Sequence, residues 1–477
     1  MHIDYFGSLP LIAIWLGLGA IGITIQAFVR NNTRLVFGYY LGTLLLTAAL
    51  ALITSGHKGT TFQDMITLGG VANYFDVVFC AAGVLTMLAA RPYLQREGVE
   101  LDEFYTLLVS ATAGMMLMAH ANNLLVLFVG IELMSITFYV MAGFLRTNIR
   151  SVEASLKYFL FGAFASGFLV YGMSLIYGAT GSLQYNVIRD VVAQNATNFP
   201  TLFAIGAVLM AVAMSFKIAA FPFHQWAPDV YEGSPTVVTA FMSTAGKAAA
   251  FSAFVALFIA LMPGTSTLTP QLQLMLAVVS AITMLVGNIT AVAQTNIKRM
   301  LAYSSIAHAG YLLMGIVSNS ADGYSGIAFY VTSYVFMQLG AFVVVGILER
   351  QNNLLLEIND YAGLAKREPM LAFSMAVFML SLAGIPPFAG FFGKYLLFVA
   401  AIETGYTWLT IVAVVSSVVS AYFYLGLIVK MYFTEPSGER EPATAGLAGI
   451  TLVVTTAVSI VLGLFASPFL ATFKSWW

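Results

Sequence analysis

The chain carries very little charge for its length. Asp, Glu, Lys and Arg make up 9% of its 477 residues, whereas soluble domains carry about 25%. The 20 basic and 21 acidic residues nearly balance, so no basic face is available to bind nucleic acid. With 60% hydrophobic residues and a mean hydropathy of +0.89, the composition predicts a multi-pass membrane protein whose partners are lipid, other membrane subunits and ions.

Cysteine is almost absent, since Cys80 stands alone. One thiol excludes a disulfide framework, and it excludes an iron–sulfur cluster held by this chain alone because such clusters need about four thiolates. The five histidines show no metal-binding spacing, so no metal site is expected. The first residues lack the basic region and cleavage site of a signal peptide, and the first apolar run is therefore expected to remain as a helix.

Apolar windows of about 20 residues, the length that crosses a bilayer, recur along the whole chain. They predict an all-α membrane protein of about 14 transmembrane helices, with residues 1–477 forming a single polytopic domain. The windows are 9–28, 34–53, 72–90, 104–119, 122–144, 152–176, 200–226, 235–260, 270–294, 300–317, 324–348, 370–400, 405–432 and 446–470.

Basic residues outside these windows are distributed unevenly, and cytoplasmic loops are where Lys and Arg accumulate. Connections after odd-numbered windows hold Arg30, Arg34, Arg91, Arg96, Arg146, Arg150, Lys298, Arg299, Arg350, Lys366, Arg367, Lys430 and Arg440. The opposite connections hold only Lys58, Arg189 and Lys474. This asymmetry predicts that both termini lie on the non-cytoplasmic side.

A weak internal repeat divides the chain. Residues 138–143 resemble residues 310–315, and Pro222 and the pair Pro386-Pro387 interrupt a window in each half. We expect two inverted five-helix repeats, at 104–260 and 270–432, a pattern common in transporters.

Four lysines, Lys157, Lys217, Lys247 and Lys394, lie inside apolar windows together with one acid, Glu132. Each such charge costs roughly 2.5–3.5 kcal/mol, and such groups usually mark ion or proton pathways. Glu132 shares a helix face with Ser135 and Tyr139, and a static ion pair between helices is the alternative to a functional role.

Prolines accompany two of the lysines. Pro222 follows Lys217 and should open the helix near Ile218, and Pro386-Pro387 precedes Lys394. Freed backbone at membrane depth needs a protein interior or a wet cavity, although a lysine reaching the interface remains an alternative for both.

Lys247 lies about 18 Å along its helix, too deep to reach either surface, in line with Thr236, Thr239 and Ser243. His308 aligns with Ser304 and Tyr311; a histidine that only hydrogen-bonds in the core is the alternative. For Lys157 the alternative is a surface pair with Glu153, one turn earlier.

Two long motifs carry a family resemblance: residues 216–235 read FKIAAFPFHQWAPDVYEGSP, and residues 298–311 read KRMLAYSSIAHAGY. Over essentially its whole length the chain resembles the subunit N family of respiratory complex I, the proton-pumping NADH–quinone oxidoreductase. Ala245-Gly246 departs from the proline-containing version of that family before Lys247.

The resemblance implies a translocase subunit without its own redox centre, in the inner (plasma) membrane of a bacterium. It implies that Glu132 pairs with Lys217, that Lys247 is the central proton carrier, and that Lys394 leads to the outer side. It gives His308 and Lys157 auxiliary roles. NADH, flavin, iron–sulfur clusters and quinone are expected in partner subunits, with other membrane-arm subunits, including antiporter-like ones, as neighbours.

Two other functions stay open. The large subunits of multi-subunit cation/proton antiporters share the glutamate and lysine pattern, and sodium-dependent proton flux without NADH would favour that function. A scaffold that transports nothing is the other, and full activity after neutralising the lysines would support it.

Overall fold

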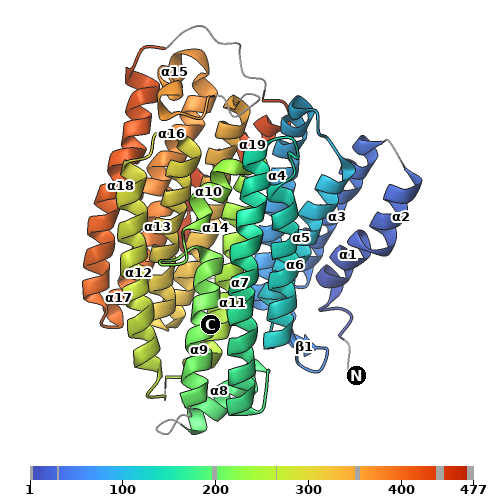
Figure 1. The fold of residues 1–477 in the computed structure, drawn as a ribbon, viewed down its shortest axis with the longest axis vertical. Helices are drawn as coiled ribbons and strands as arrows, with labels where there is room; N and C mark the ends of the chain where they lie inside the picture. Colours follow the sequence, from blue (N-terminus) through green and yellow to red (C-terminus); the bar gives the residue numbers. More distant parts are fainter. Residues whose placement is uncertain are drawn as a thin grey trace.

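The computed structural model describes residues 4–29, 32–195, 201–264, 266–349, 355–436 and 445–469. Long helices run side by side along the vertical axis of Figure 1, and a short hairpin of β1 (Gly59–Thr61) and β2 (Ile66–Leu68) lies at one end. The predicted all-α membrane architecture is confirmed.

Every apolar window predicted from the sequence contains helix. The first eleven α-helices are α1 (Leu9–Leu18), α2 (Ala20–Phe28), α3 (Thr33–Ile53), α4 (Gly70–Glu97), α5 (Asp102–His120), α6 (Leu124–Ala142), α7 (Ile149–Thr180), α8 (Tyr185–Gln194), α9 (Thr201–Ile218), α10 (Trp226–Gly233) and α11 (Thr236–Leu261). They are followed by α12 (Thr269–Val292), α13 (Ile297–Ser318), α14 (Ala321–Leu348), the 3-10 turn η2 (Ile358–Tyr361), α15 (Leu364–Arg367), α16 (Pro369–Ala383), α17 (Ala389–Glu403), α18 (Thr407–Phe433) and α19 (Ala448–Leu464).

Within the described ranges, 11 helices are long and apolar enough to cross a membrane, and α16 and α19 are shorter apolar helices. Several windows differ from a single uninterrupted span. The window 370–400 is divided into α16 and α17, for example, and α5 begins with Asp102 and Glu103. The count of about 14 therefore stays a prediction.

The two predicted helix interruptions are confirmed. The helix α9 ends at Ile218 and α10 begins at Trp226, with Pro222 between them. The backbone N–H of Phe221 in this gap donates to Thr283 Oγ1 of α12 at 3.0 Å, so a neighbouring helix satisfies freed backbone. Likewise α16 ends at Ala383, and α17 begins after Pro386-Pro387.

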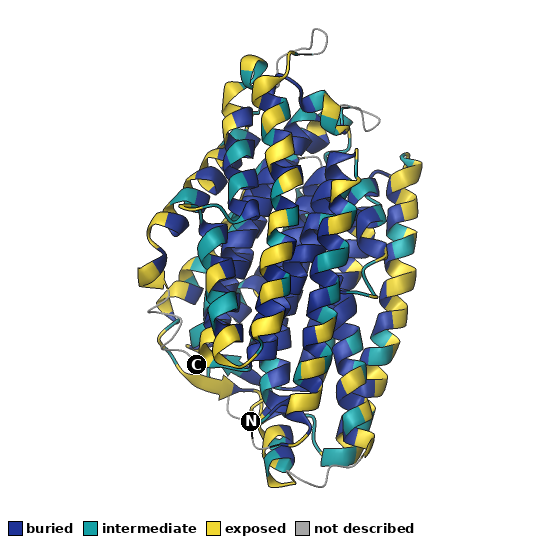
Figure 2. Ribbon diagram, turned by 90° about the vertical axis from the view of Figure 1, so that its left-hand side faces the viewer, coloured by how far each residue is buried: buried dark blue, intermediate teal, exposed yellow. Residues whose placement is uncertain are grey.

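The helices α11, α13 and α14 form the centre of the molecule, and nearly all of their residues are buried. Figure 2 shows a buried interior, in dark blue, behind outer helices that are exposed along one side. The alanine-rich sequence of α11, including Ala248, Ala249 and Ala250, lets neighbouring backbones approach closely. A lysine on α11 or α13 is therefore surrounded by protein rather than by lipid.

The ends of the helix bundle differ in content. In Figure 1, α15, which carries Lys366 and Arg367, lies at the upper end, and the hairpin and α8, which carries Arg189, lie at the lower end. The predicted sides of these basic residues thus fall at opposite ends of the fold.

Candidate functional site

Lys217 lies in the last turn of α9, where the helix is about to break. Its side chain is 9% exposed, and its Nζ donates to Ser135 Oγ of α6 at 2.8 Å. Ser135 belongs to the face of α6 that was predicted to carry the polar groups. The break positions the lysine because Trp226, beyond the gap, donates its ring N–H to the Phe216 carbonyl at 3.2 Å.

Glu132 lies one turn away on α6 and is half-buried. Its Oε1 accepts a hydrogen bond of 2.5 Å from Ser166 Oγ of α7. Among the described residues no ion pair joins Glu132 to Lys217, although the two lie within electrostatic reach of each other. This conformation holds the glutamate and the lysine on separate serines, and their pairing stays a prediction.

The helix α7, whose Ser166 contacts Glu132, has an exposed apolar face. Leu160, Phe164 and Tyr171 of α7 are all exposed. Glu132 thus sits close to the edge of the chain, whereas Lys217 is enclosed by it.

Lys247 occupies the middle of α11 and is 3% exposed. Its Nζ donates at 2.5 Å to the backbone carbonyl of Ser305, which belongs to α13. The polar residues that precede it on α11 are all buried, namely Thr236, Thr239, Ser243 and Thr244. Lys247 therefore lies deep inside the protein, as its position along the helix predicted.

His308 lies one turn beyond Ser305 on α13 and is buried. Its Nδ1 is 2.5 Å from the Tyr330 hydroxyl, and its Nε2 is 3.1 Å from the Tyr424 hydroxyl. The imidazole lies within electrostatic reach of both Lys247 and Lys394. His308 therefore stands between the central lysine and the lysine of α17.

Lys394 lies in the second turn of α17 and is 4% exposed. Its Nζ donates to the Ala383 carbonyl at 3.0 Å and to Ser417 Oγ at 2.9 Å, and it lies 4.8 Å from the centre of the Tyr311 ring. Ala383 is the last residue of α16, so the second helix break supplies a free carbonyl to this ammonium group.

Lys157 differs from the other three lysines because its side chain is 38% exposed. Its Nζ lies 2.8 Å from Glu153 and 2.7 Å from Asp229, so the predicted surface pair exists and has a second acid. Burial tends to raise the pKa of Asp229, but hydrogen bonds from Lys157 and Arg299 hold that pKa below its usual value. Lys157 belongs to a charged surface cluster rather than to the buried series.

Sequence reasoning placed Lys298 in a loop, and the structure contradicts this. Lys298 lies in the first turn of α13 and has no exposed surface. Asn296 caps this helix, and the Lys298 ammonium group reaches the carbonyl of Ser234, which lies between α10 and α11. No local pattern in the sequence predicts that contact.

A second buried acid was also missed. Asp76 of α4 and His120 of α5 are both fully buried, and Asp76 Oδ2 lies 2.8 Å from His120 Nε2. His120 Nδ1 is 2.5 Å from the Thr67 carbonyl of the hairpin. Asp76 falls inside the predicted window 72–90, so the statement that Glu132 is the one intramembrane acid is wrong, and the residue could have been found from the sequence.

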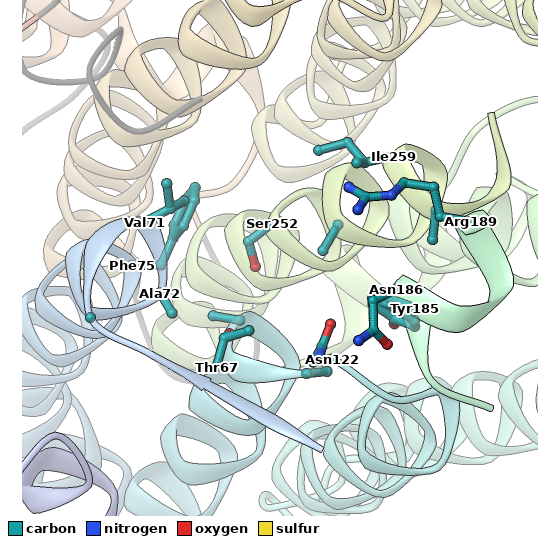
Figure 3. A pocket seen from close by; sticks show the side chains of 15 residues that line it. Thr67, Val71, Ala72, Phe75, Asn122, Tyr185, Asn186, Arg189, Ser252 and Ile259 are labelled. Carbon is teal, nitrogen blue, oxygen red and sulfur yellow. The ribbon is translucent and has the colours of Figure 1, made fainter. Parts of the chain in front are cut away.

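A cavity of about 310 Å³ lies beside this pair at the hairpin end of the bundle. Figure 3 shows Val71 and Phe75 on one side of it and Asn186 and Arg189 on the other, with Ser252 of α11 between them. No group of three or more His, Cys, Asp and Glu that could hold a metal ion occurs in the described part of the chain.

Comparisons with known proteins agree over nearly the whole chain. Residues 121–420 match the family described as NADH:quinone oxidoreductase/Mrp antiporter, transmembrane. A protein of Trichlorobacter lovleyi named NADH-quinone oxidoreductase subunit N is 45% identical over 95% of this chain and 93% of its own length.

Solved structures have the same fold. A chain of respiratory complex I from Thermus thermophilus with bound aureothin has a TM-score of 0.83 and 34% identity, covering 97% of this chain and 98% of that one. A chain of the Mrp complex from Dietzia sp. has a TM-score of 0.86 over 98% of this chain and 96% of that one, and at 22% identity it shares the fold alone.

Proposed function

This chain belongs to the NADH:quinone oxidoreductase/Mrp antiporter family and, within it, to the subunit N relatives, and from that membership we propose that it is a proton-translocating membrane-arm subunit of an NADH–quinone oxidoreductase. The complex as a whole is a translocase, and this chain contributes the passage of protons rather than a redox centre.

One observation carries the proposal: three buried lysines and a histidine succeed one another through the centre of the fold. Lys217, Lys247, His308 and Lys394 come from α9, α11, α13 and α17, and each hydrogen-bonds a hydroxyl or a backbone carbonyl rather than an acid. A lysine in a static ion pair holds its proton, whereas one bonded to neutral acceptors can exchange it at lower cost.

Proton transfer follows from this arrangement. A neutral amine takes a proton and becomes an ammonium group, then returns to the amine when the proton passes to the next group. His308 lies between Lys247 and Lys394 and can hold the proton on a ring nitrogen, with the hydroxyls of Tyr330 and Tyr424 orienting the ring. Lys394 then delivers protons toward the end of the bundle where the hairpin lies.

Glu132 and Lys217 act as the control point. With both groups charged and close together, Lys217 holds its proton; with the carboxylate held by Ser166 and the ammonium group by Ser135, the attraction is weaker and the proton is released more easily. Redox chemistry in partner subunits supplies the signal that changes this separation.

The remaining assignments follow the same family membership. Neighbouring antiporter-like subunits pack beside this chain in a bacterial plasma membrane, with both termini on the non-cytoplasmic side. NADH, flavin, iron–sulfur clusters and quinone belong to the partner subunits. Residues 104–260 and 270–432 act as two inverted repeats, which is supported by the helix break that each contains.

The test is Lys247→Ala in the assembled complex. NADH-driven acidification of inverted membrane vesicles should fall relative to electron flow, because the central carrier is gone. Unchanged proton pumping in a fully assembled variant would sink the proposal and favour the scaffold. Sodium-dependent proton flux without NADH would favour the antiporter.

A further inference from the structure

Lys298 is a fourth buried lysine, and the series of groups described above does not use it. Its side chain has no exposed surface, and its Nζ donates to the Ser234 carbonyl at 2.8 Å. A buried ammonium group is costly, and a structural lysine would normally be held by direct contact with a carboxylate. Glu349 and Glu232 lie within electrostatic reach of Lys298, while its hydrogen bond goes to the neutral Ser234 carbonyl.

The charges that face Lys298 come from several elements. Glu349 follows the last residue of α14, is buried, and accepts a 2.5 Å hydrogen bond from Thr236 Oγ1 of α11. Glu232 of α10 attracts the lysine and Arg150 of α7 repels it. Glu97 and Tyr93 of α4 lie within electrostatic reach of Glu349, and Arg96 of the same helix lies within reach of both. The lysine is therefore surrounded by both signs of charge.

A charged cavity of about 230 Å³ lies on one side of Lys298. Its lining includes Arg150, Lys157, Asp229, Glu232 and Gly233. Gly233 directly precedes Ser234, whose carbonyl holds the Lys298 ammonium group. A residue that lines the cavity is thus the chain neighbour of the residue that Lys298 contacts.

On the other side, hydroxyl groups lie between the start of α13 and Lys247, close to the Lys247 end. Ser305 lies seven residues after Lys298 on the same face of α13, about 10.5 Å along the axis, and its carbonyl accepts from Lys247. The Tyr231 phenol faces the Ser305 hydroxyl, and Thr239 Oγ1 donates to the Tyr231 carbonyl at 2.9 Å. Polar groups therefore occupy the Lys247 end of the interval between the two lysines.

We propose that Lys298 passes protons from the charged cavity to Lys247, so that the central lysine is filled directly from the end of the bundle where α13 begins. This inference rests on the proposed proton translocation and names its point of entry. The Lys298 amine takes one proton from cavity water, and the ammonium group gives one proton to the hydroxyl groups leading to Lys247. Glu349 stabilises the charged form while the proton is held.

Supply of protons to Lys247 and control of their transfer are then carried out by different residues. Protons reach Lys247 without passing through Lys217, and the Glu132 and Lys217 pair then acts on transfer through its charge rather than as the supply. A purely structural Lys298 would instead need only its positive charge, to balance Glu349 and Glu232.

Lys298→Arg distinguishes these two roles. Arginine keeps the charge and can donate to the Ser234 carbonyl, but it does not give up its proton in proteins. In the assembled complex we expect NADH oxidation to persist while protons pumped per electron fall to the level of Lys247→Ala. Wild-type pumping by Lys298→Arg would overturn the inference.

Lys430→Arg is the matched control, because it makes the same exchange at a partly exposed lysine of α18 that contacts Asn359. It should pump as the wild type does. Tyr231→Phe provides a second test that does not alter any charge: it removes the hydroxyl facing Ser305 and should slow pumping at unchanged electron flow. Unchanged pumping by Tyr231→Phe would contradict the proposed route. This test can be made even if Lys298→Arg fails to assemble.

Different results would reject the proposed function and the proposed entry route through Lys298. Normal pumping by Lys247→Ala rejects the proposed function. Loss of pumping in Lys247→Ala together with normal pumping in Lys298→Arg rejects only the entry route.

Discussion

Removing His120 should destabilise the protein far more than removing its partner's charge. His120→Ala leaves the Asp76 carboxylate fully buried without the Nε2 group that lies 2.8 Å from it, and it also removes the contact with the Thr67 carbonyl. Breaking a buried ion pair in this way costs about 3–5 kcal/mol. Asp76→Asn is milder, because a neutral His120 keeps Nδ1–H for Thr67 and its Nε2 can accept from the new amide. We expect a cost of about 1 kcal/mol, the value of an ordinary hydrogen bond.

Membrane complexes unfold irreversibly, so the half-life of the solubilised complex at a fixed temperature is the measure. A difference of about 3 kcal/mol between the variants corresponds to up to about 160-fold in rate, at 1.36 kcal/mol for each factor of ten. The fraction of complex that stays intact on a native gel after heating gives both half-lives.

His57→Ala is the matched control, because His57 also pairs with an aspartate, Asp4, at the same end of the molecule, but both side chains are partly exposed. Its cost should be below about 1 kcal/mol. Half-lives that are equal for His120→Ala and Asp76→Asn would refute the reasoning, since the two variants differ in whether a buried charge is left alone.

Two further predictions concern the helix break and the surface cluster. Gly390→Ala should lower the amount of assembled complex, because a Cβ there would lie 1.9 Å from the Ser381 carbonyl oxygen, whereas Gly42→Ala, in open space on α3, should leave the amount on a native gel unchanged. Lys157→Met should cost less than about 1 kcal/mol in stability, since its ion pairs are partly exposed, and vesicle acidification should fall less than in Lys247→Ala; an equal fall would place Lys157 in the buried series after all.

The features that depend on local sequence were predictable. The lengths of the apolar windows gave the helices, and Pro222 and Pro386-Pro387 marked the two breaks, because a missing N–H acts on its own helix. The depth of Lys247 also followed from its position along one helix.

The features that depend on packing between distant segments were not predictable. Lys298 is buried and contacts Ser234, which lies between α10 and α11. No local sequence pattern predicts this contact. The separation of Glu132 from Lys217 depends on Ser166, a residue 34 positions away that no motif connected with the glutamate. Asp76 was visible in its window, but its pairing with His120 depends on the contact of α4 with α5.

The half-buried position of Glu132 has a consequence for how such a complex would transmit a signal. Lys217 lies wholly within the chain, but Glu132 lies behind the bare side of α7, within range of whatever protein packs there. If Glu132 has the proposed control role, protons cross the membrane along its normal, whereas a protein packed against α7 acts on Glu132 from within the membrane plane. On that proposal, exchanging the neighbouring subunit would change the ease of proton release from Lys217 without altering one residue of the proposed proton route.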